Sequence, residues 1–232
     1  MLELFPEGFE EVASDGSLQL VAYTDSGGEE RLWHVFGGAR GEDVAADWRD
    51  RWEAFHRPVR VGPVWIGPPW DEPPPEATAV VIAPGRAFGT GAHPTTQLCV
   101  ELLLDTSRGS LVDLGCGSGV LSVVAGKLGF APVFARDLDE PAVEATRANA
   151  RANAVELDVA VADVLTAELP RTEVAVANIT RPTLEALAPR LRTPVLIGSG
   201  YLPFEDAELV GYRHLRRLER DGWAADLYEA AE

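Results

Sequence analysis

A glycine-rich stretch between two apolar segments constrains the fold of this chain more than any other feature. Residues 111–119 read Leu-Val-Asp-Leu-Gly-Cys-Gly-Ser-Gly, and the alanine- and valine-rich segment 120–128 follows, closed by Gly129. This order predicts a buried strand, a tight turn and a helix, because glycine accepts the positive φ angles of such turns. A helix that starts at the turn presents free amides and a partial positive charge to a ligand. The stretch therefore predicts a nucleotide-cofactor turn.

The spacing of the glycines distinguishes between cofactor classes. The dinucleotide fingerprint G-x-G-x-x-G needs its third glycine where this chain has Val120. The observed pattern, D-x-G-x-G-x-G, resembles the first motif of Rossmann-like S-adenosylmethionine-dependent methyltransferases. That resemblance implies a cofactor with an amino-acid end, whose ammonium group suits the carboxylate of Asp113. The alternative is a glycine-rich turn that binds no ligand.

Strands and helices alternate after this turn. Alternation of this kind indicates a parallel sheet covered on both faces. The tail differs, because Asp221-Gly222 predicts a tight turn between two antiparallel strands. We predict strands at 132–135, 157–161, 173–177, 195–197, 214–220 and 223–229, and helices at 141–152, 183–191 and 204–212. The fold class is therefore α/β, a mostly parallel Rossmann-like sheet with an antiparallel C-terminal hairpin.

Composition divides the chain into three parts. We predict a small N-terminal α+β domain at residues 1–57. It contains a strand at 18–23 and a helix on which Trp48, Trp52 and Phe55 form one apolar stripe. Residues 58–76 are rich in proline and predict a linker that lies partly on the next domain. Residues 77–232 form the large α/β domain, with a first strand at 79–82 and a helix that begins near Pro94.

Four polar residues are expected at the carboxyl ends of successive strands, where doubly wound sheets bind their ligands. They are Asp113, Asp137, Asp163 and Asn178. Asp137 follows Gly115 by 22 residues, close to the separation at which an acid binds the ribose hydroxyls of a nucleotide. Asp163 is expected to receive the adenine amino group. The amide of Asn178 can both donate and accept hydrogen bonds.

Three stretches together carry a more specific resemblance. Residues 84–96 read P-G-R-A-F-G-T-G-A-H-P-T-T, the glycine turn follows, and residues 176–179 read V-A-N-I. They resemble the bacterial methyltransferases that modify large-subunit ribosomal protein eleven, and residues 47–49 and 65–70 resemble the linker of that family. The similarity covers roughly residues 45–200, and the F-G-T-G-x-H-x-T-T run is not shared by methyltransferases in general.

The resemblance implies methyl transfer from S-adenosylmethionine to lysine side chains, or to the N-terminal amine, of that ribosomal protein. It also implies that the small N-terminal domain holds the substrate. The positions that it assigns to cofactor binding are Thr96, Gly115, Asp137 and Asn178, with Gly117 in the same turn and with Phe88 and Gly89 near the methionine end.

The chemistry of such a transfer needs alignment more than acid–base catalysis, because it is an in-line displacement at a sulfonium carbon. A lysine must first lose its proton, and desolvation beside the sulfonium lowers the lysine pKa. The amide oxygen of Asn178 is the candidate that orients the amine, and no residue is an obvious base. His93 is a candidate proton relay, with a structural role as the alternative.

Charge and cysteine content restrict the partners. The formal net charge of −17 disfavours nucleic acid and favours a basic protein partner, although acidity can also serve solubility alone. The two cysteines, Cys99 and Cys116, provide neither a disulfide framework nor a metal-ligand cluster. No apolar run approaches the length of a membrane span. We expect a cytoplasmic monomer that binds no metal and no membrane.

Three alternatives remain open from the sequence. The first is a methyltransferase of the same fold that acts on another protein or on a small amine. The second is a nicotinamide-dependent oxidoreductase, and the third is a binding module without turnover. The N-terminal region is shorter than the complete substrate domain of the family, the usual glycine turn is missing between Leu191 and Pro194, and Arg136 needs room near the ribose.

Overall fold

The computed structural model describes residues 10–14, 17–21, 32, 35–36, 57–84 and 89–231. The chain divides into two compact units, Met1–Trp52 and Glu53–Glu232. In the first unit, β1 (Glu10–Ser14) pairs antiparallel with β2 (Ser17–Val21), which confirms the strand predicted at 18–23. The predicted stripe of Trp48, Trp52 and Phe55 lies outside the described residues.

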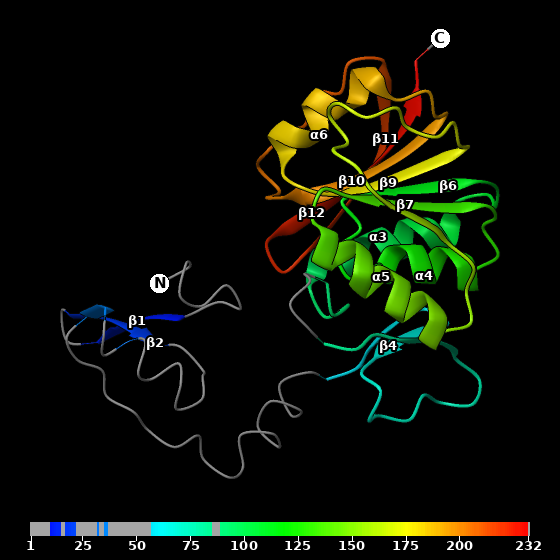
Figure 1. The fold of residues 1–232 in the computed structure, drawn as a ribbon. Helices are drawn as coiled ribbons and strands as arrows, with labels where there is room; N and C mark the ends of the chain where they lie inside the picture. The colour runs from blue at the N-terminus through cyan, green and yellow to red at the C-terminus, as the bar shows by residue number, and fades with distance from the viewer. Residues whose placement is uncertain are drawn as a thin grey trace. The chain divides into compact units, whose positions relative to one another are not determined.

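The second unit contains a seven-stranded sheet with the order β11-β12-β10-β9-β6-β7-β8 (Figure 1). The five strands from β10 to β8 in this order run parallel, whereas β12 is antiparallel to β10 and β11 to β12. This confirms the mostly parallel sheet with an antiparallel C-terminal hairpin. The strands are β6 (Leu111–Leu114), β7 (Val133–Asp137), β8 (Asp158–Val161), β9 (Val174–Asn178), β10 (Val195–Tyr201), β11 (Tyr212–Arg220) and β12 (Trp223–Ala230).

Helices cover both faces of this sheet (Figure 1). On one face lie α3 (Pro94–Asp105), α4 (Val120–Lys127) and α5 (Glu140–Ala152), and on the other α6 (Arg181–Leu187), which continues as a 3₁₀ helix at Ala188–Arg190. The strands consequently alternate between two apolar cores. On β9, Val176 packs in the core with α3 and α4, whereas Ala177 packs in the core with α6.

The proline-rich segment expected as a linker supplies two strands of a smaller sheet. β3 (Val59–Val61) pairs antiparallel with β4 (Val64–Gly67), and β5 (Thr78–Val81), the strand predicted at 79–82, runs parallel to β4. Val64 and Ile66 are buried in the core shared with α3 and α4. The second unit therefore begins before this segment, at Glu53, because the apolar residues between the prolines bury a face of the small sheet.

The helix predicted at 204–212 is wrong. Residues 202–211 form turns and irregular backbone, of which only Leu209 is buried. Arg217 on β11 donates hydrogen bonds to the carbonyls of Pro203 and Glu205, at 2.8 and 3.2 Å. Since these carbonyls find partners outside the segment, the helical pattern loses the backbone bonds on which it depends. The hairpin at Asp221-Gly222 is confirmed, with φ angles of 49° and 78°.

Candidate functional site

The glycine turn follows β6 and has the backbone that its sequence predicts. Gly115, Gly117 and Gly119 adopt φ angles of 80°, 55° and 79°, which side chains with a Cβ rarely accept. A Cβ on Gly115 would lie 2.6 Å from Cγ2 of Ile179. Gly119 caps α4 and provides no side-chain hydrogen bond to it. The turn therefore presents backbone rather than side chains at the N-terminus of α4, as a ligand site requires.

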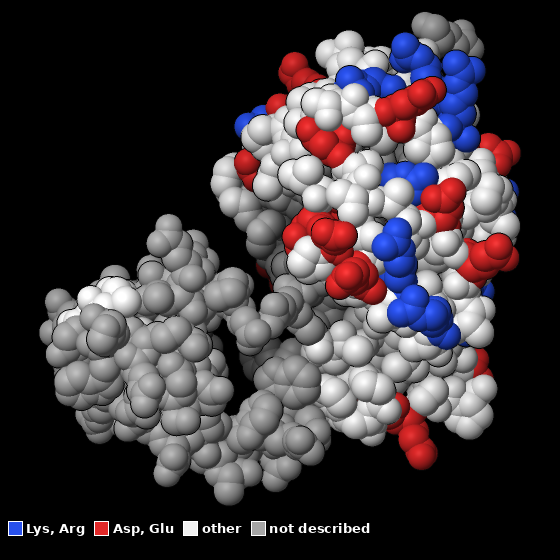
Figure 2. All heavy atoms as spheres, viewed as in Figure 1, with Lys and Arg blue, Asp and Glu red and all other residues white. Residues whose placement is uncertain are grey.

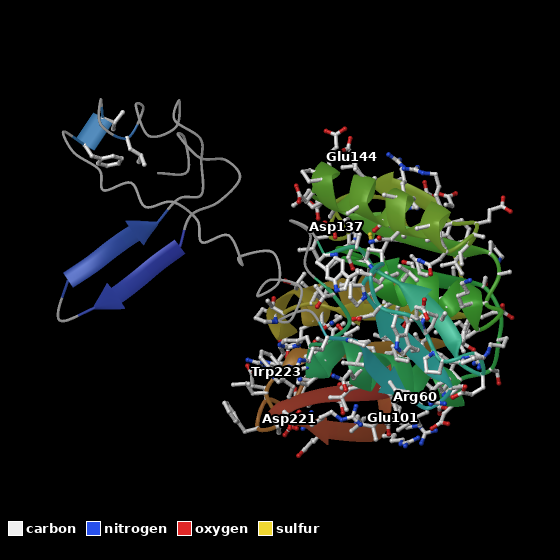
Figure 3. The ribbon with its side chains drawn as sticks, turned by 90° about the horizontal axis from the view of Figure 1, so that it is seen from below. Arg60, Glu101, Asp137, Glu144, Asp221 and Trp223 are labelled. Atoms are coloured by element: carbon white, nitrogen blue, oxygen red, sulfur yellow. The ribbon has the colours of Figure 1, made fainter. Side chains whose placement is uncertain are left out.

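Asp137, the last residue of β7, lies against this turn (Figure 3). Its Oδ2 accepts a hydrogen bond from the amide of Gly117 at 2.8 Å, and its Oδ1 accepts one from the amide of Asp139 at 3.0 Å. A carboxylate has roughly four acceptor positions, so this one retains capacity for a diol. Arg136 leaves the required room, because its guanidinium donates to Asp158 on β8, at 3.0 Å.

Asp163 follows β8 and orders its own loop. Its Oδ1 accepts a hydrogen bond from the amide of Leu165 and its Oδ2 one from Oγ1 of Thr166, both at 2.9 Å. The preceding residue, Ala162, donates its amide to the carbonyl of Asp137 at 2.7 Å. The structure thus brings the backbone at Asp163 beside Asp137, with its carboxylate used inside the loop.

Asp113 is buried rather than exposed at the end of its strand. It is the last residue but one of β6, its side chain is 1% exposed, and Oγ of Ser122 on α4 donates to it at 2.6 Å. Burial raises the pKa of Asp113 to about 7, against the opposing effect of the Ser122 hydrogen bonds. The carboxylate predicted to meet the ammonium group of a ligand therefore faces α4.

Replacing Asp113 with asparagine is expected to change how stability depends on pH. The native state raises the pKa of this carboxyl from 3.8 to about 7. The proton that it binds therefore contributes its full stability below pH 3.8, and this contribution is lost as the pH rises to about 7. Asp113→Asn cannot lose a proton. Its free energy of unfolding, relative to the wild type, should therefore increase from about pH 4 to about pH 8 in urea denaturation, and a constant difference would contradict the prediction.

Asn178 ends β9 and belongs to a chain of three polar side chains. Its Nδ2 donates to Oγ1 of Thr95 at 3.1 Å, and that hydroxyl lies 2.7 Å from Nδ1 of His93. The backbone amide of Thr95 also donates to Nδ1 of His93, so this nitrogen is an acceptor and the hydroxyl is its second donor. Burial lowers the pKa of His93, which favours the neutral ring. The chain fixes the Asn178 amide with its nitrogen toward α3.

Sequence reasoning did not identify Thr95, although it stands two residues after His93 in the H-P-T-T run. His93 has a defined structural role as the N-cap of α3, and its ring packs edge-on against Trp223 at 4.8 Å between centroids. The adjacent Thr96 is 1% exposed, and its Oγ1 has no hydrogen-bond partner within the described part of the chain. A buried hydroxyl without a partner is costly, and it suits a position expected to bind a ligand.

The segment before α3 reaches the glycine turn through Gly89. This glycine adopts a φ of 107°, and Oγ of Ser118 donates to its carbonyl. Phe88, the other residue expected near the methionine end, lies outside the described residues. The structure therefore joins Gly89, the glycine turn and Asp137 by direct contacts, and it places Ile179, next to Asn178, against Gly115.

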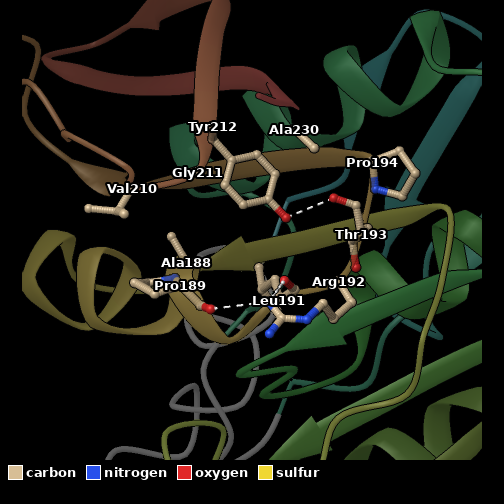
Figure 4. Close-up of a pocket in the computed structure, with 10 residues that line it drawn as sticks. All are labelled: Ala188, Pro189, Leu191, Arg192, Thr193, Pro194, Val210, Gly211, Tyr212 and Ala230. Carbon is tan, nitrogen blue, oxygen red and sulfur yellow. Dashed lines mark hydrogen bonds between the residues drawn. The ribbon is translucent and has the colours of Figure 1, made fainter. Parts of the chain in front are cut away.

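A separate pocket of about 490 Å³ lies at the end of the parallel strands opposite to the glycine turn (Figure 4). Its residues precede β10 and β11 and end β12, so they lie at the amino ends of the parallel strands. Oη of Tyr212 donates to the carbonyl of Thr193 at 2.7 Å, and Arg192 donates to the carbonyl of Leu191 at 3.2 Å. The polar groups of this pocket are thus paired with its own backbone, and the pocket is distinct from the predicted site.

The basic residues of β11 are paired within the molecule. Among the described residues, each of its four arginines has an acidic partner. The pairs are Arg213–Glu229, Arg216–Asp105, Arg217–Asp226 and Arg220–Glu101. On the face shown in Figure 2, acidic and basic side chains are interspersed. The densest basic cluster of the sequence therefore forms ion pairs rather than a continuous positive surface.

Neither a metal site nor a membrane span is evident in the part of the chain that the structure describes. No three His, Cys, Asp or Glu side chains gather there in a way that would hold a metal ion. None of the helices described is long and apolar enough to cross a membrane.

Comparison with known proteins gives a consistent match. The family model described as ribosomal protein L11 methyltransferase (PrmA) matches residues 19–203. A protein of that name from Shewanella frigidimarina is 38% identical over 210 residues, which are 85% of this chain and 67% of that protein. Another from Shewanella pealeana is 43% identical over 163 residues, 66% of this chain and 54% of that protein. The chain thus spans about half to two thirds of the length of these relatives.

Solved structures show the same fold. A ribosomal protein L11 methylase from Lactobacillus delbrueckii superposes with a TM-score of 0.66 at 24% identity, over 76% of this chain and 100% of that one. A tRNA (uracil-54, C5)-methyltransferase from Pyrococcus abyssi, in complex with S-adenosyl-L-homocysteine, gives a TM-score of 0.52 at 17% identity, over 76% and 44%. At these identities the likeness establishes the fold alone.

Proposed function

Because the chain belongs to the ribosomal protein L11 methyltransferase family, we propose that it transfers methyl groups from S-adenosylmethionine to amines of ribosomal protein L11. The amines are lysine side chains or the N-terminal amine. One observation carries the proposal: the glycine turn with Asp137 lies beside the strand whose end holds the Asn178 amide in a fixed orientation. A nucleoside cofactor and an amine can therefore meet at one edge of the sheet.

The residues at this edge fit the cofactor. Asp137 would bind the ribose hydroxyls, and the amides of the glycine turn would face its amino-acid end. The unpartnered hydroxyl of Thr96 would complete the site with a hydrogen bond to the cofactor. When bound, S-adenosylmethionine supplies a methyl group on a positively charged sulfur. The loop at Asp163 would contact the adenine, through backbone or through the remaining acceptor capacity of its carboxylate.

The protein's own part in the reaction is alignment. Since Thr95 holds the nitrogen of the Asn178 amide, the amide oxygen is left as the acceptor for an amine hydrogen. This orients the nitrogen lone pair of a neutral amine. His93 accepts from Thr95 through Nδ1 and caps α3, so its contacts support a positioning role more than a proton relay.

Replacing Thr95 with valine tests this arrangement. The change keeps the shape of the side chain and removes the hydroxyl that joins His93 to Asn178. We expect kcat to decrease by roughly tenfold, because one hydrogen bond no longer orients the amide, while KM for S-adenosylmethionine stays close to the wild-type value. Thr96→Val should show the reverse pattern, a raised KM for the cofactor. Equal effects of both variants on KM would contradict the assignment of Thr95.

The substrate class follows from the family and from charge. A net charge of −17 favours approach of a lysine-bearing protein, and such a substrate places the reaction in the cytoplasm. We also propose that the unit Met1–Trp52 recognises the substrate and that Glu53–Glu232 carries out the transfer. An alternative with the same fold is methylation of another protein or a small amine, since the match spans only part of the relatives' length.

The deciding experiment is the intact mass of unmodified L11 after incubation with this protein and S-adenosylmethionine. Increases by whole methyl increments would support enzyme, cofactor and substrate together, and peptide mapping would locate the amines. If calorimetry shows cofactor binding but L11 gains no mass, the substrate is a different protein or amine. Binding of NAD in place of S-adenosylmethionine would overturn the methyltransferase proposal.

A further inference from the structure

Two buried polar side chains connect the glycine turn to the backbone of Ala83 and of Gly89. Asn149 on α5 is 4% exposed and Ser118 is 3% exposed. Oδ1 of Asn149 accepts a hydrogen bond from the amide of Ala83 at 3.2 Å, and its Nδ2 donates to the carbonyl of Ser118 at 2.8 Å. Oγ of Ser118 in turn donates to the carbonyl of Gly89. One hydrogen-bonded path therefore joins Ala83, the glycine turn and Gly89.

The chemistry of this path requires an amide at position 149. Asn149 accepts on one side and donates on the other, and both partners are backbone groups. Aspartate would present a second acceptor to the Ser118 carbonyl, and an apolar residue would leave the buried carbonyl of Ser118 and the amide of Ala83 without this partner. Unpaired polar groups in such a place are costly. The contacts thus account for asparagine rather than for any residue of similar size.

Ser118 connects this path of hydrogen bonds to the predicted cofactor site. The residue stands between Gly117, whose amide binds Asp137, and Gly119, which caps α4. A shift of the Ser118 backbone would therefore move the group that faces the predicted ribose position and the amides at the start of α4. Neither Asn149 nor Ser118 belongs to the residues that the resemblance assigns to the cofactor.

We propose that Asn149 and Ser118 are positioning residues that hold the backbone of Ala83 and Gly89 on the glycine turn and thereby set the affinity for the cofactor. Neither side chain needs to touch the cofactor for this effect. The inference rests on the proposed function, because it assumes that S-adenosylmethionine binds at the glycine turn.

Asn153, the C-cap residue of the same helix, provides a matched control. It is 5% exposed, its Oδ1 accepts from the amide of Val81 at 2.8 Å, and its Nδ2 donates to the carbonyls of Val81 and Asn149 at 2.6 and 2.8 Å. These bonds hold β5 on α5 and do not reach the turn. Asn149→Ala and Asn153→Ala thus remove the same buried side-chain amide, from α5 and from its C-cap, with and without a connection to the glycine turn.

The test measures Kd for S-adenosylmethionine by calorimetry, with Tm and circular dichroism of each variant as folding controls. Asn149→Ala is expected to raise Kd by roughly tenfold, and Asn153→Ala is expected to lower Tm and leave Kd unchanged. Asn149→Asp keeps the acceptor for Ala83 and loses the donor for Ser118, so it should raise Kd as well. Ser118→Ala, which loses the bond to Gly89, provides a second route if Asn149 variants do not fold.

The outcomes separate this inference from the proposed function. Equal values of Kd for Asn149→Ala, Asn153→Ala and the wild type would overturn the positioning role. So would equal increases of Kd in both alanine variants, since these would reflect a general loss of structure in α5. A wild-type protein that binds no S-adenosylmethionine would instead overturn the proposed function, before any variant is compared.

Discussion

Replacing Arg217 with alanine is expected to lower the free energy of unfolding by about 3–5 kcal/mol, because the buried carboxylate of Asp226 loses its arginine partner. Nε and Nη2 of Arg217 donate to the two carboxylate oxygens of Asp226 at 2.9 Å each, and the Asp226 side chain is 0% exposed. Burial raises the pKa of Asp226, but hydrogen bonds from Arg217, Tyr201 and His214 outweigh burial and hold this pKa below its usual value. The same guanidinium anchors the irregular segment 202–211.

Arg213 on the same strand is the control for this prediction. It pairs with Glu229, and the two side chains are 67% and 40% exposed, so solvent screens their attraction and the pair is worth about 0–1 kcal/mol. Urea denaturation followed by tryptophan fluorescence compares Arg217→Ala with Arg213→Ala. Losses of similar size would show that burial of Asp226 does not make its ion pair important for stability.

Replacing Asp137 with alanine is expected to weaken the binding of S-adenosylmethionine by about 1–3 kcal/mol, or roughly 5- to 150-fold in Kd. Its carboxylate would lose charge-assisted hydrogen bonds to the ribose, and the amide of Gly117 would lose its acceptor. Calorimetric titration of the variant measures the effect. Asp137→Asn, which keeps one acceptor oxygen, should give an intermediate Kd.

The control for Asp137 is another acid on the same sheet. Asp158 on the neighbouring strand β8 pairs with Arg136, and its side chain is 59% exposed. Asp158→Ala removes the same charge from the molecule, and Arg136 keeps its hydrogen bond to the backbone carbonyl of residue 158, at 2.7 Å, so its Kd should equal that of the wild type. If Asp137→Ala binds as tightly as Asp158→Ala, then Asp137 has no role at the ribose.

Local signals predicted most of the second unit. The central parallel strands β6 and β9 are buried on both faces, so their sequences are apolar apart from Asp113 and Asn178 and stand out in the chain. Proline at the start of α3 and glycine at the start of α4 mark helix ends by their backbone geometry. The resemblance to the L11 methyltransferase family was carried by contiguous motifs, and the family match confirms it.

Predictions failed where the outcome depends on partners that belong to a different element of the fold. A helical pattern exists over 204–212, but Arg217 binds two carbonyls of that segment from β11. Asp113 was predicted at an open strand end, whereas its burial depends on how α4 packs over β6. The apolar residues among the prolines of 58–76 form strands because α3 and α4 offer a core to cover. None of these contacts follows from the hydrophobic periodicity of the segment itself, because each depends on how two elements pack.

Some residues of the candidate site were predicted from the sequence, and others were found only in the structure. The glycine turn, Asp137 and Asn178 were predicted from spacing and resemblance, and their roles at a cofactor stay predictions. Thr95 and Asn149 were not predicted, because each is an ordinary polar residue whose partner lies 83 or 66 residues away in the chain. Sequence by itself determined the fold class, the turn and the family, since these depend on backbone preferences and contiguous motifs. Only the tertiary structure decided which polar side chains hold the turn, because buried hydrogen bonds depend on which groups the packed helices and strands bring within reach.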